Sequence, residues 1–253
     1  MSGRRRFLLA AFGDPGHAFP AIALGRELAA RGHDVCLQTW HRWGEHVERE
    51  GMRFAAAPVY QVFPTAERPL KPYVAAVRAA AETRPLIREF DPEVVVADIL
   101  TVAAALAAEC EERPWVTLVP HVLPTHERGL PPYSIGAIRP RSRAGERLWS
   151  LARPLLASGE MRGREELNGA RARVGLPPLE HLHGGISREL ALVATFPQLE
   201  YPRAGWEPWM RITGPLLWEQ PFGDTEPPPG DDPLVLVAPS TSQDPDQRML
   251  RAA

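Results

Sequence analysis

The sequence predicts an α/β protein built on a doubly wound, parallel sheet. Three observations lead to this fold class. Short apolar runs recur along the chain, amphipathic helical stretches separate them, and the clearest run, residues 94–97, is continuous and β-branched. Such a run is expected of a strand buried on both faces, and regular strand–helix alternation is typical of parallel sheets. The 253 residues are 44% hydrophobic and 24% charged, which suits a protein with a sizeable core.

The first predicted unit is a strand, a glycine turn and a helix. Apolar residues 7–12 form the strand, and a turn with Gly13 and Gly16 follows. In the helix at 18–31 the apolar residues share one arc, and Gly32 stops it. The pattern then predicts a strand at 34–39, a short polar helix at 42–50 and a short strand at 54–58.

The middle of the chain repeats the alternation. A loop at 58–72 precedes a helix at 72–90, in which Pro85 predicts a kink or a break. The further elements expected are a strand at 94–98, a helix at 101–112, a strand at 115–119, a proline-rich loop at 120–140, two helical pieces within 142–174, and strands at 189–195 and 211–215. The helical pieces carry many arginines, which indicate either a solvated face or an anion-binding surface.

The last part of the chain changes in composition. Residues 219–233 are rich in proline, glycine and acidic residues and are typical of a linker. Residues 234–238 predict a new buried strand, and 247–253 begin a helix. Because one strand and half a helix cannot bury a core, we expect them to open a second domain whose remainder lies outside this chain.

Composition limits the partners and the compartment. A net charge of −2 gives no indication of nucleic acid binding. Cys36 and Cys110 are too few for a disulfide framework, which favours a reducing, cytoplasmic setting. The arginines at 4–6 precede an apolar run, as in an export signal, but Gly13 ends that run early, so a sheet strand is favoured. No run reaches the ~20 apolar residues of a spanning helix, so we expect no stable membrane insertion.

His17 and Asp98 are the candidate catalytic residues. His17 lies where the first helix begins, and the positive end of that helix favours the neutral imidazole, which can act as a base. Asp98 ends the strand at 94–98, so both residues are expected at the carboxyl edge of the sheet, where ligands bind. If the two strands are neighbours, the carboxylate can orient the imidazole. The alternatives are a structural histidine and an aspartate that caps the helix at 101–112.

The glycine turn argues against a dinucleotide cofactor. Gly13-x-x-Gly16 lacks the G-x-G-x-x-G spacing of nicotinamide and flavin sites, so an oxidoreductase is the weaker alternative. Another alternative is a standalone Rossmann-like binding or partner module without turnover.

Several segments resemble one large enzyme family. They are GHAFP at 16–20, LGRELAARGH at 24–33, DPEVVVAD at 91–98, the stretch 168–179 and TGPL at 213–216. Together they are similar to inverting, nucleotide-sugar-dependent glycosyltransferases of the natural-product type, which have two Rossmann-like domains in the GT-B arrangement, and the bacterial antibiotic branch is the most similar.

The resemblance implies a division of the chain and a reaction. Residues 1–215 would form the acceptor-binding Rossmann-like domain, 216–233 the interdomain linker, and 234–253 the start of the nucleotide-sugar-binding domain. His17 would remove a proton from a hydroxyl of a small-molecule acceptor, and Asp98 would stabilise the charged imidazole. The co-substrate would be a UDP- or dTDP-sugar, with no metal and no tightly bound cofactor.

The resemblance also suggests binding residues, and one expected motif is missing. Acceptor contacts would come from Phe63, Tyr73, His121 and Tyr133, and donor contacts from Gly16, Ser240 and Thr241. The glycine- and histidine-rich donor motif of the family does not occur in this sequence. We therefore expect this chain alone to transfer sugar poorly or not at all.

Overall fold

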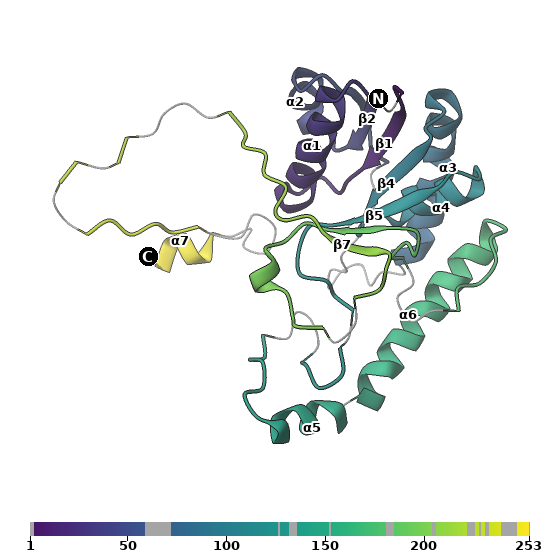
Figure 1. Cartoon of the computed structure of the whole chain (residues 1–253). Helices are drawn as coiled ribbons and strands as arrows, with labels where there is room; N and C mark the ends of the chain where they lie inside the picture. Colours follow the sequence, from purple (N-terminus) through teal and green to yellow (C-terminus); the bar gives the residue numbers. More distant parts are fainter. Residues whose placement is uncertain are drawn as a thin grey trace.

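The described residues form one seven-stranded sheet in which every neighbouring pair is parallel (Figure 1). The computed structural model describes residues 3–58, 72–125, 127–131, 136–151, 153–180, 185–203, 206–221, 226–227, 229–230, 233–238 and 247–252. The strands are β1 (Arg6–Ala10), β2 (Asp34–Thr39), β3 (Arg53–Ala56), β4 (Val94–Asp98), β5 (Trp115–Val119), β6 (Ala191–Val193) and β7 (Met210–Ile212). Their order is β3-β2-β1-β4-β5-β6-β7, so the predicted doubly wound parallel sheet is confirmed.

Helices cover both faces of this sheet, as two hydrophobic clusters demonstrate. The described helices are α1 (Pro15–Ala30), η1 (His41–Trp43), α2 (Gly44–Arg49), α3 (Pro72–Phe90), α4 (Val102–Cys110), α5 (Arg143–Leu151), α6 (Arg153–Arg173), η2 (Pro197–Leu199) and α7 (Arg248–Ala252). Leu9 and Leu37 belong to a cluster with residues of α1 and α2, whereas their neighbours Leu8 and Cys36 belong to a cluster with residues of α3 and α4. This alternation explains why the strands are apolar at consecutive positions.

The strand order places the turn after β1 beside the end of β4. From β1 the chain continues through β2 to β3 on one side, and then crosses back to form β4 on the other side of β1. The register pairs Ala10 with Ala97, so β1 and β4 end at the same level. A crevice at such a reversal of strand order is the usual ligand site of open α/β sheets.

Three local expectations differ from the structure. Helix α1 begins at Pro15, three residues earlier than expected, because proline suits the first turn of a helix. Helix α3 runs through Pro85 without a break. The buried strand predicted at 234–238 is wrong: Leu234 and Leu236 are 70% and 89% exposed, and the segment pairs with none of the described strands. Figure 1 shows this segment as an extended stretch that lies apart from the sheet and beside α7.

Residues after β7 return to the first half of the domain. The indole of Trp218 is buried, lies 4.9 Å from the ring of Phe19 in α1, and donates a hydrogen bond from Nε1 to Glu50 at 2.7 Å. Arg26 also donates to the backbone oxygen of Leu217 at 3.4 Å. The segment up to Trp218 therefore packs on α1, while the division of the chain at 215 and 233 stays a prediction.

Candidate functional site

The structure brings His17 and Asp98 together at the reversal of strand order. Nδ1 of His17, in the first turn of α1, lies 2.7 Å from Oδ1 of Asp98, the last residue of β4. The Asp98 carboxylate is fully buried, and the His17 side chain is 16% exposed. Since an ionised carboxylate only accepts hydrogen bonds, Nδ1 carries the proton in this pair. Nε2 of the neutral ring is then the nitrogen that can accept a proton.

The Asp98 carboxylate is held by the backbone of β1 as well as by His17. Its Oδ2 accepts a hydrogen bond from the backbone N–H of Phe12 at 3.2 Å. Nearby, the Thr101 hydroxyl lies 3.0 Å from the carbonyl oxygen of Ala10 and 2.8 Å from that of Asp98, which joins the ends of the two strands. The N-cap residue of α4 is Thr101, and so the capping interpretation of Asp98 is wrong.

Gly13 is needed in the turn because an indole occupies the space beside it. A Cβ atom at Gly13 would lie 1.9 Å from Cγ of Trp40, whereas a Cβ at Gly16 would meet nothing within 4 Å. The Gly13 carbonyl accepts hydrogen bonds from Arg42 at 2.6 Å and from the Trp43 indole at 2.8 Å. The glycine thus lets the turn close against the tryptophans that follow β2.

His121 lies opposite His17, on the loop after β5. The two ring centroids are 6.1 Å apart, and Nδ1 of His121 is 2.8 Å from the carbonyl oxygen of Val122. A carbonyl can only accept, so Nδ1 of His121 is protonated as well. Burial lowers the pKa of His121 below its usual value, although its bond to Val122 acts in the opposite direction. At neutral pH the imidazole of His121 is therefore uncharged, and it lies beside the imidazole of His17.

Tyr73 borders the site from the start of α3. It lines a cavity of about 190 Å³ together with Ile99, Pro124 and Thr125, and this cavity reaches the residue next to Asp98. The same tyrosine lines a second cavity of about 310 Å³ against α6. Burial raises the pKa of its phenol. The other predicted binding residues, Phe63, Tyr133, Ser240 and Thr241, lie outside the described residues, and Gly16 lies beside His17 in the first turn of α1.

Two charged residues near the site were not singled out from the sequence. Glu200 and Arg203 lie between β6 and β7, and their side chains are only 2% and 4% exposed. Both contact the loop after β5 that carries His121. Their opposite charges at a spacing of three residues are the signal that could have identified them as a pair, because buried charges are almost always paired.

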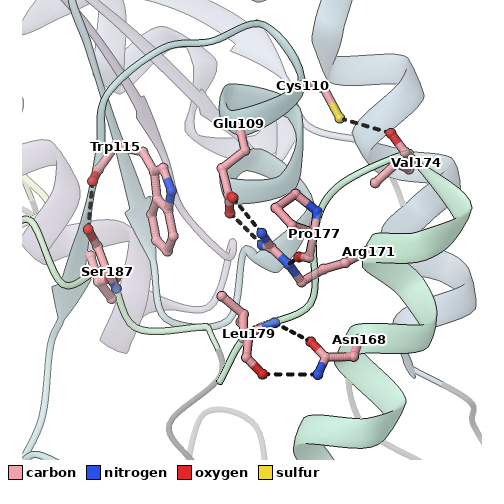
Figure 2. Close-up of polar contacts among 10 residues, drawn as sticks. Glu109, Cys110, Trp115, Asn168, Arg171, Val174, Pro177, Leu179 and Ser187 are labelled. Carbon is pink, nitrogen blue, oxygen red and sulfur yellow. Dashed lines mark hydrogen bonds and ion pairs between the residues drawn. The ribbon is translucent and has the colours of Figure 1, made fainter. Parts of the chain in front are cut away.

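Arg171 is neither part of a solvated face nor an anion site. Its guanidinium is 4% exposed and donates two hydrogen bonds of 2.7 Å to the carboxylate of Glu109 in α4. It also donates to the carbonyl of Pro177 at 2.7 Å, and Asn168 exchanges two hydrogen bonds with Leu179 (Figure 2). Arg171 therefore fastens α6 and the following loop to α4.

Within the described ranges, no group of three or more histidine, cysteine or acidic side chains is placed to hold a metal ion. None of the helices that the structure describes has the length and apolarity required to cross a membrane.

Known proteins share both sequence and fold with this chain. Residues 7–117 match the glycosyltransferase family 28 N-terminal domain. The 4'-demethylrebeccamycin synthase of Lentzea aerocolonigenes is 26% identical over 246 residues, which cover 88% of this chain and 58% of that protein.

Solved structures show the same fold at low identity. The glycotransferase of kitacinnamycin superimposes with a TM-score of 0.66 at 18% identity, covering 90% of this chain and 56% of that one. The calicheamicin glycosyltransferase CalG4 superimposes with a TM-score of 0.60 at 20% identity, and the match covers 85% of this chain and 52% of CalG4. The glycosyltransferase VinC in complex with DTDP superimposes with a TM-score of 0.50 at 16% identity, and the match covers 79% of this chain and 51% of VinC.

The chain spans little more than half of the length of these proteins. The match over residues 7–117 includes β1, the turn with His17 and β4 with Asp98. Residues 7–117 are therefore similar to the glycosyltransferase family 28 N-terminal domain, and the chain has the α/β fold of the solved glycosyltransferases.

Proposed function

We propose that this chain is the acceptor-binding part of an inverting glycosyltransferase of the antibiotic type. The observation that carries the proposal is the 2.7 Å contact between His17 Nδ1 and the buried carboxylate of Asp98, at the edge of the sheet where α/β proteins bind ligands. A histidine oriented by a carboxylate is suited to remove a proton from a hydroxyl.

In the proposed reaction, Nε2 of His17 accepts the proton of the acceptor hydroxyl while that oxygen attacks the anomeric carbon of the sugar. The bond from that carbon to the nucleotide diphosphate breaks, and the configuration inverts. Asp98 stabilises the imidazolium through the Nδ1–H bond. His121 and Tyr73, which border the dyad, are proposed acceptor contacts.

The donor is proposed to be a nucleotide sugar, with dTDP as the first nucleotide to test, because VinC was crystallised with that diphosphate. UDP is the second. Gly16, Ser240 and Thr241 remain the proposed donor contacts in this chain, and residues 234–253 the proposed beginning of the sugar-nucleotide domain. A cytoplasmic setting fits the two cysteines, which are free in the structure.

The test uses the protein encoded by the complete reading frame. It is incubated with dTDP- and UDP-sugars and a panel of phenolic and aliphatic hydroxyl acceptors, and products are detected by mass and their anomeric configuration by NMR. We expect transfer with inversion, which His17→Ala lowers at least about 100-fold. His33→Ala is the matched control, because His33 precedes β2 at the opposite edge of the sheet.

Equal transfer by wild type and His17→Ala would remove His17 from the mechanism. If acceptors bind but no nucleotide sugar is turned over, the chain belongs to a binding module instead, the alternative to which the sequence also pointed.

A further inference from the structure

Glu200 and Arg203 form a buried charged pair that contacts the His121 loop. Oε1 of Glu200 lies 3.4 Å from Nη2 of Arg203, and neither side chain is more than 4% exposed. Removing two charges from water is costly, and the attraction between them offsets that cost only when further hydrogen bonds satisfy both groups. The partners of this pair therefore indicate what it stabilises.

Most of the partners are backbone groups of the loop after β5. Glu200 Oε2 accepts a hydrogen bond from the N–H of Leu123 at 2.8 Å. Arg203 donates to the carbonyl of Leu123 at 2.7 Å, to the carbonyl of Thr125 at 3.0 Å and to the Thr125 hydroxyl at 2.9 Å. Charged side chains thus hold both polar backbone groups of Leu123 in a segment that is part of no strand.

One of these contacts acts directly on the peptide that orients His121. The N–H of Leu123 and the carbonyl of Val122 belong to the same planar peptide unit, so fixing one fixes the other. The N–H is bound by Glu200, and the carbonyl accepts the hydrogen bond from Nδ1 of His121. The orientation of the His121 ring therefore depends on a carboxylate 79 positions later in the chain.

We propose that Glu200 and Arg203 are positioning residues, which hold the peptide between Val122 and Leu123 so that His121 faces His17 in its Nδ1–H form. The role of His121 toward an acceptor rests on the proposed function, but the positioning itself does not. Nε2 of His121 is then the ring nitrogen that does not carry the proton.

The test measures the His121 tautomer rather than turnover. In this chain, labelled with ¹⁵N, the ring nitrogen shifts of His121 distinguish the Nδ1–H form from the Nε2–H form. We expect the Nδ1–H form in wild type and a mixture in Glu200→Ala, which leaves the Leu123 N–H without its acceptor. The amide of Leu123 should also exchange at least about 10-fold faster. Glu200→Gln should largely restore both, since the amide oxygen can still accept.

Glu109→Ala is the matched control, because it breaks another carboxylate–arginine pair, in which Arg171 is buried and Glu109 is 23% exposed, and none of the hydrogen bonds of this pair involves the His121 loop (Figure 2). It should lower stability comparably and leave the His121 tautomer unchanged. If Glu200→Ala does not fold, Glu200→Asp keeps the charge beside Arg203 and withdraws the carboxylate from Leu123. The proposal is overturned if a folded Glu200 variant shows the same ¹⁵N shifts of the His121 ring as wild type and Glu109→Ala. This outcome does not depend on whether the complete enzyme transfers sugar.

Discussion

The Asp98→Asn substitution tests the dyad most directly. The structure gives the Asp98 carboxylate two hydrogen bonds, from Nδ1 of His17 at 2.7 Å and from the Phe12 amide at 3.2 Å, in a fully buried position. Asparagine has nearly the same shape, so the fold should persist. Only the negative charge opposite the imidazole is lost, and the amide can turn its NH₂ group toward Nδ1.

The size of the effect follows from these contacts. A hydrogen bond to a charged group contributes about 1.5–3 kcal/mol, and about 1.4 kcal/mol corresponds to a tenfold change in rate. Weaker stabilisation of the imidazolium alone therefore predicts about a 10- to 150-fold loss in kcat. If the asparagine NH₂ group donates to Nδ1, the proton moves to Nε2, and the remaining general-base contribution, up to about 10⁴-fold in total, is lost as well.

The assay is sugar transfer by the complete protein, with Asp91→Asn as control. Asp91 precedes β4 at the other end of the strand and pairs with Arg6 and Arg113 at the surface. We expect this control to keep its activity. Turnover of Asp98→Asn within twofold of wild type, with a native fold, would refute the assigned role of the carboxylate.

Three further predictions concern stability and reactivity. Gly13→Ala should lower the free energy of unfolding by about 1–3 kcal/mol in denaturant titrations, since the added Cβ collides with Trp40. Gly16→Ala should change the free energy of unfolding by less than about 0.5 kcal/mol, because its Cβ meets nothing within 4 Å. Equal effects of the two substitutions would contradict the packing argument. Burial raises the pKa of Cys36 to about 11 from 9.0, so at pH 8 its alkylation should be about 100-fold slower than in the denatured chain, and comparable rates would show that the thiol is accessible. Because the pKa of His121 is lowered in the native protein, the unfolded chain binds a proton at this residue first as the pH falls below 6.5. The free energy of unfolding should therefore decrease from about pH 6.5 down to the native pKa. Between about pH 7.5 and 5.5, His121→Asn should show a smaller loss of Tm than the wild-type chain. A larger loss in that variant would mean that His121 is not buried as a neutral ring.

Local pattern sufficed to predict the central sheet and the dyad. The β-branched run that becomes β4 and the glycine turn after β1 are recognisable within a few residues, and parallel pairing sends both carboxyl ends to one edge. The proximity of His17 and Asp98 then required only that β1 and β4 be neighbours, which the strand order confirms. Their roles in a reaction stay predictions.

The positioning contacts could not be predicted in the same way. Glu200 and Arg203 are proposed to act through the backbone of the loop after β5. In that loop the Thr125 carbonyl, which Arg203 binds, lies 78 positions earlier in the chain, and no sequence periodicity connects the loop with the segment that carries the charged pair. The arginine-rich pattern of residues 142–174 does not distinguish the buried Arg171 from exposed arginines, because nothing local indicates its partner Glu109 in α4. The run at 234–238 shows the opposite error: its composition is that of a buried strand, but a strand also needs neighbours, and the described sheet offers it none.

The position of β1 between β2 and β4 has a consequence for how the site is assembled during folding. The pairing of β1 with β2 joins residues 28 positions apart, but its pairing with β4 joins Phe7 to Val94, across most of the first hundred residues. Closing such a long loop is slow relative to local helix and turn formation. The contact of Asp98 with Phe12 and His17 therefore forms only after the slow central pairing, and amide exchange at Phe12 reports whether a variant has completed its sheet before any chemistry is measured.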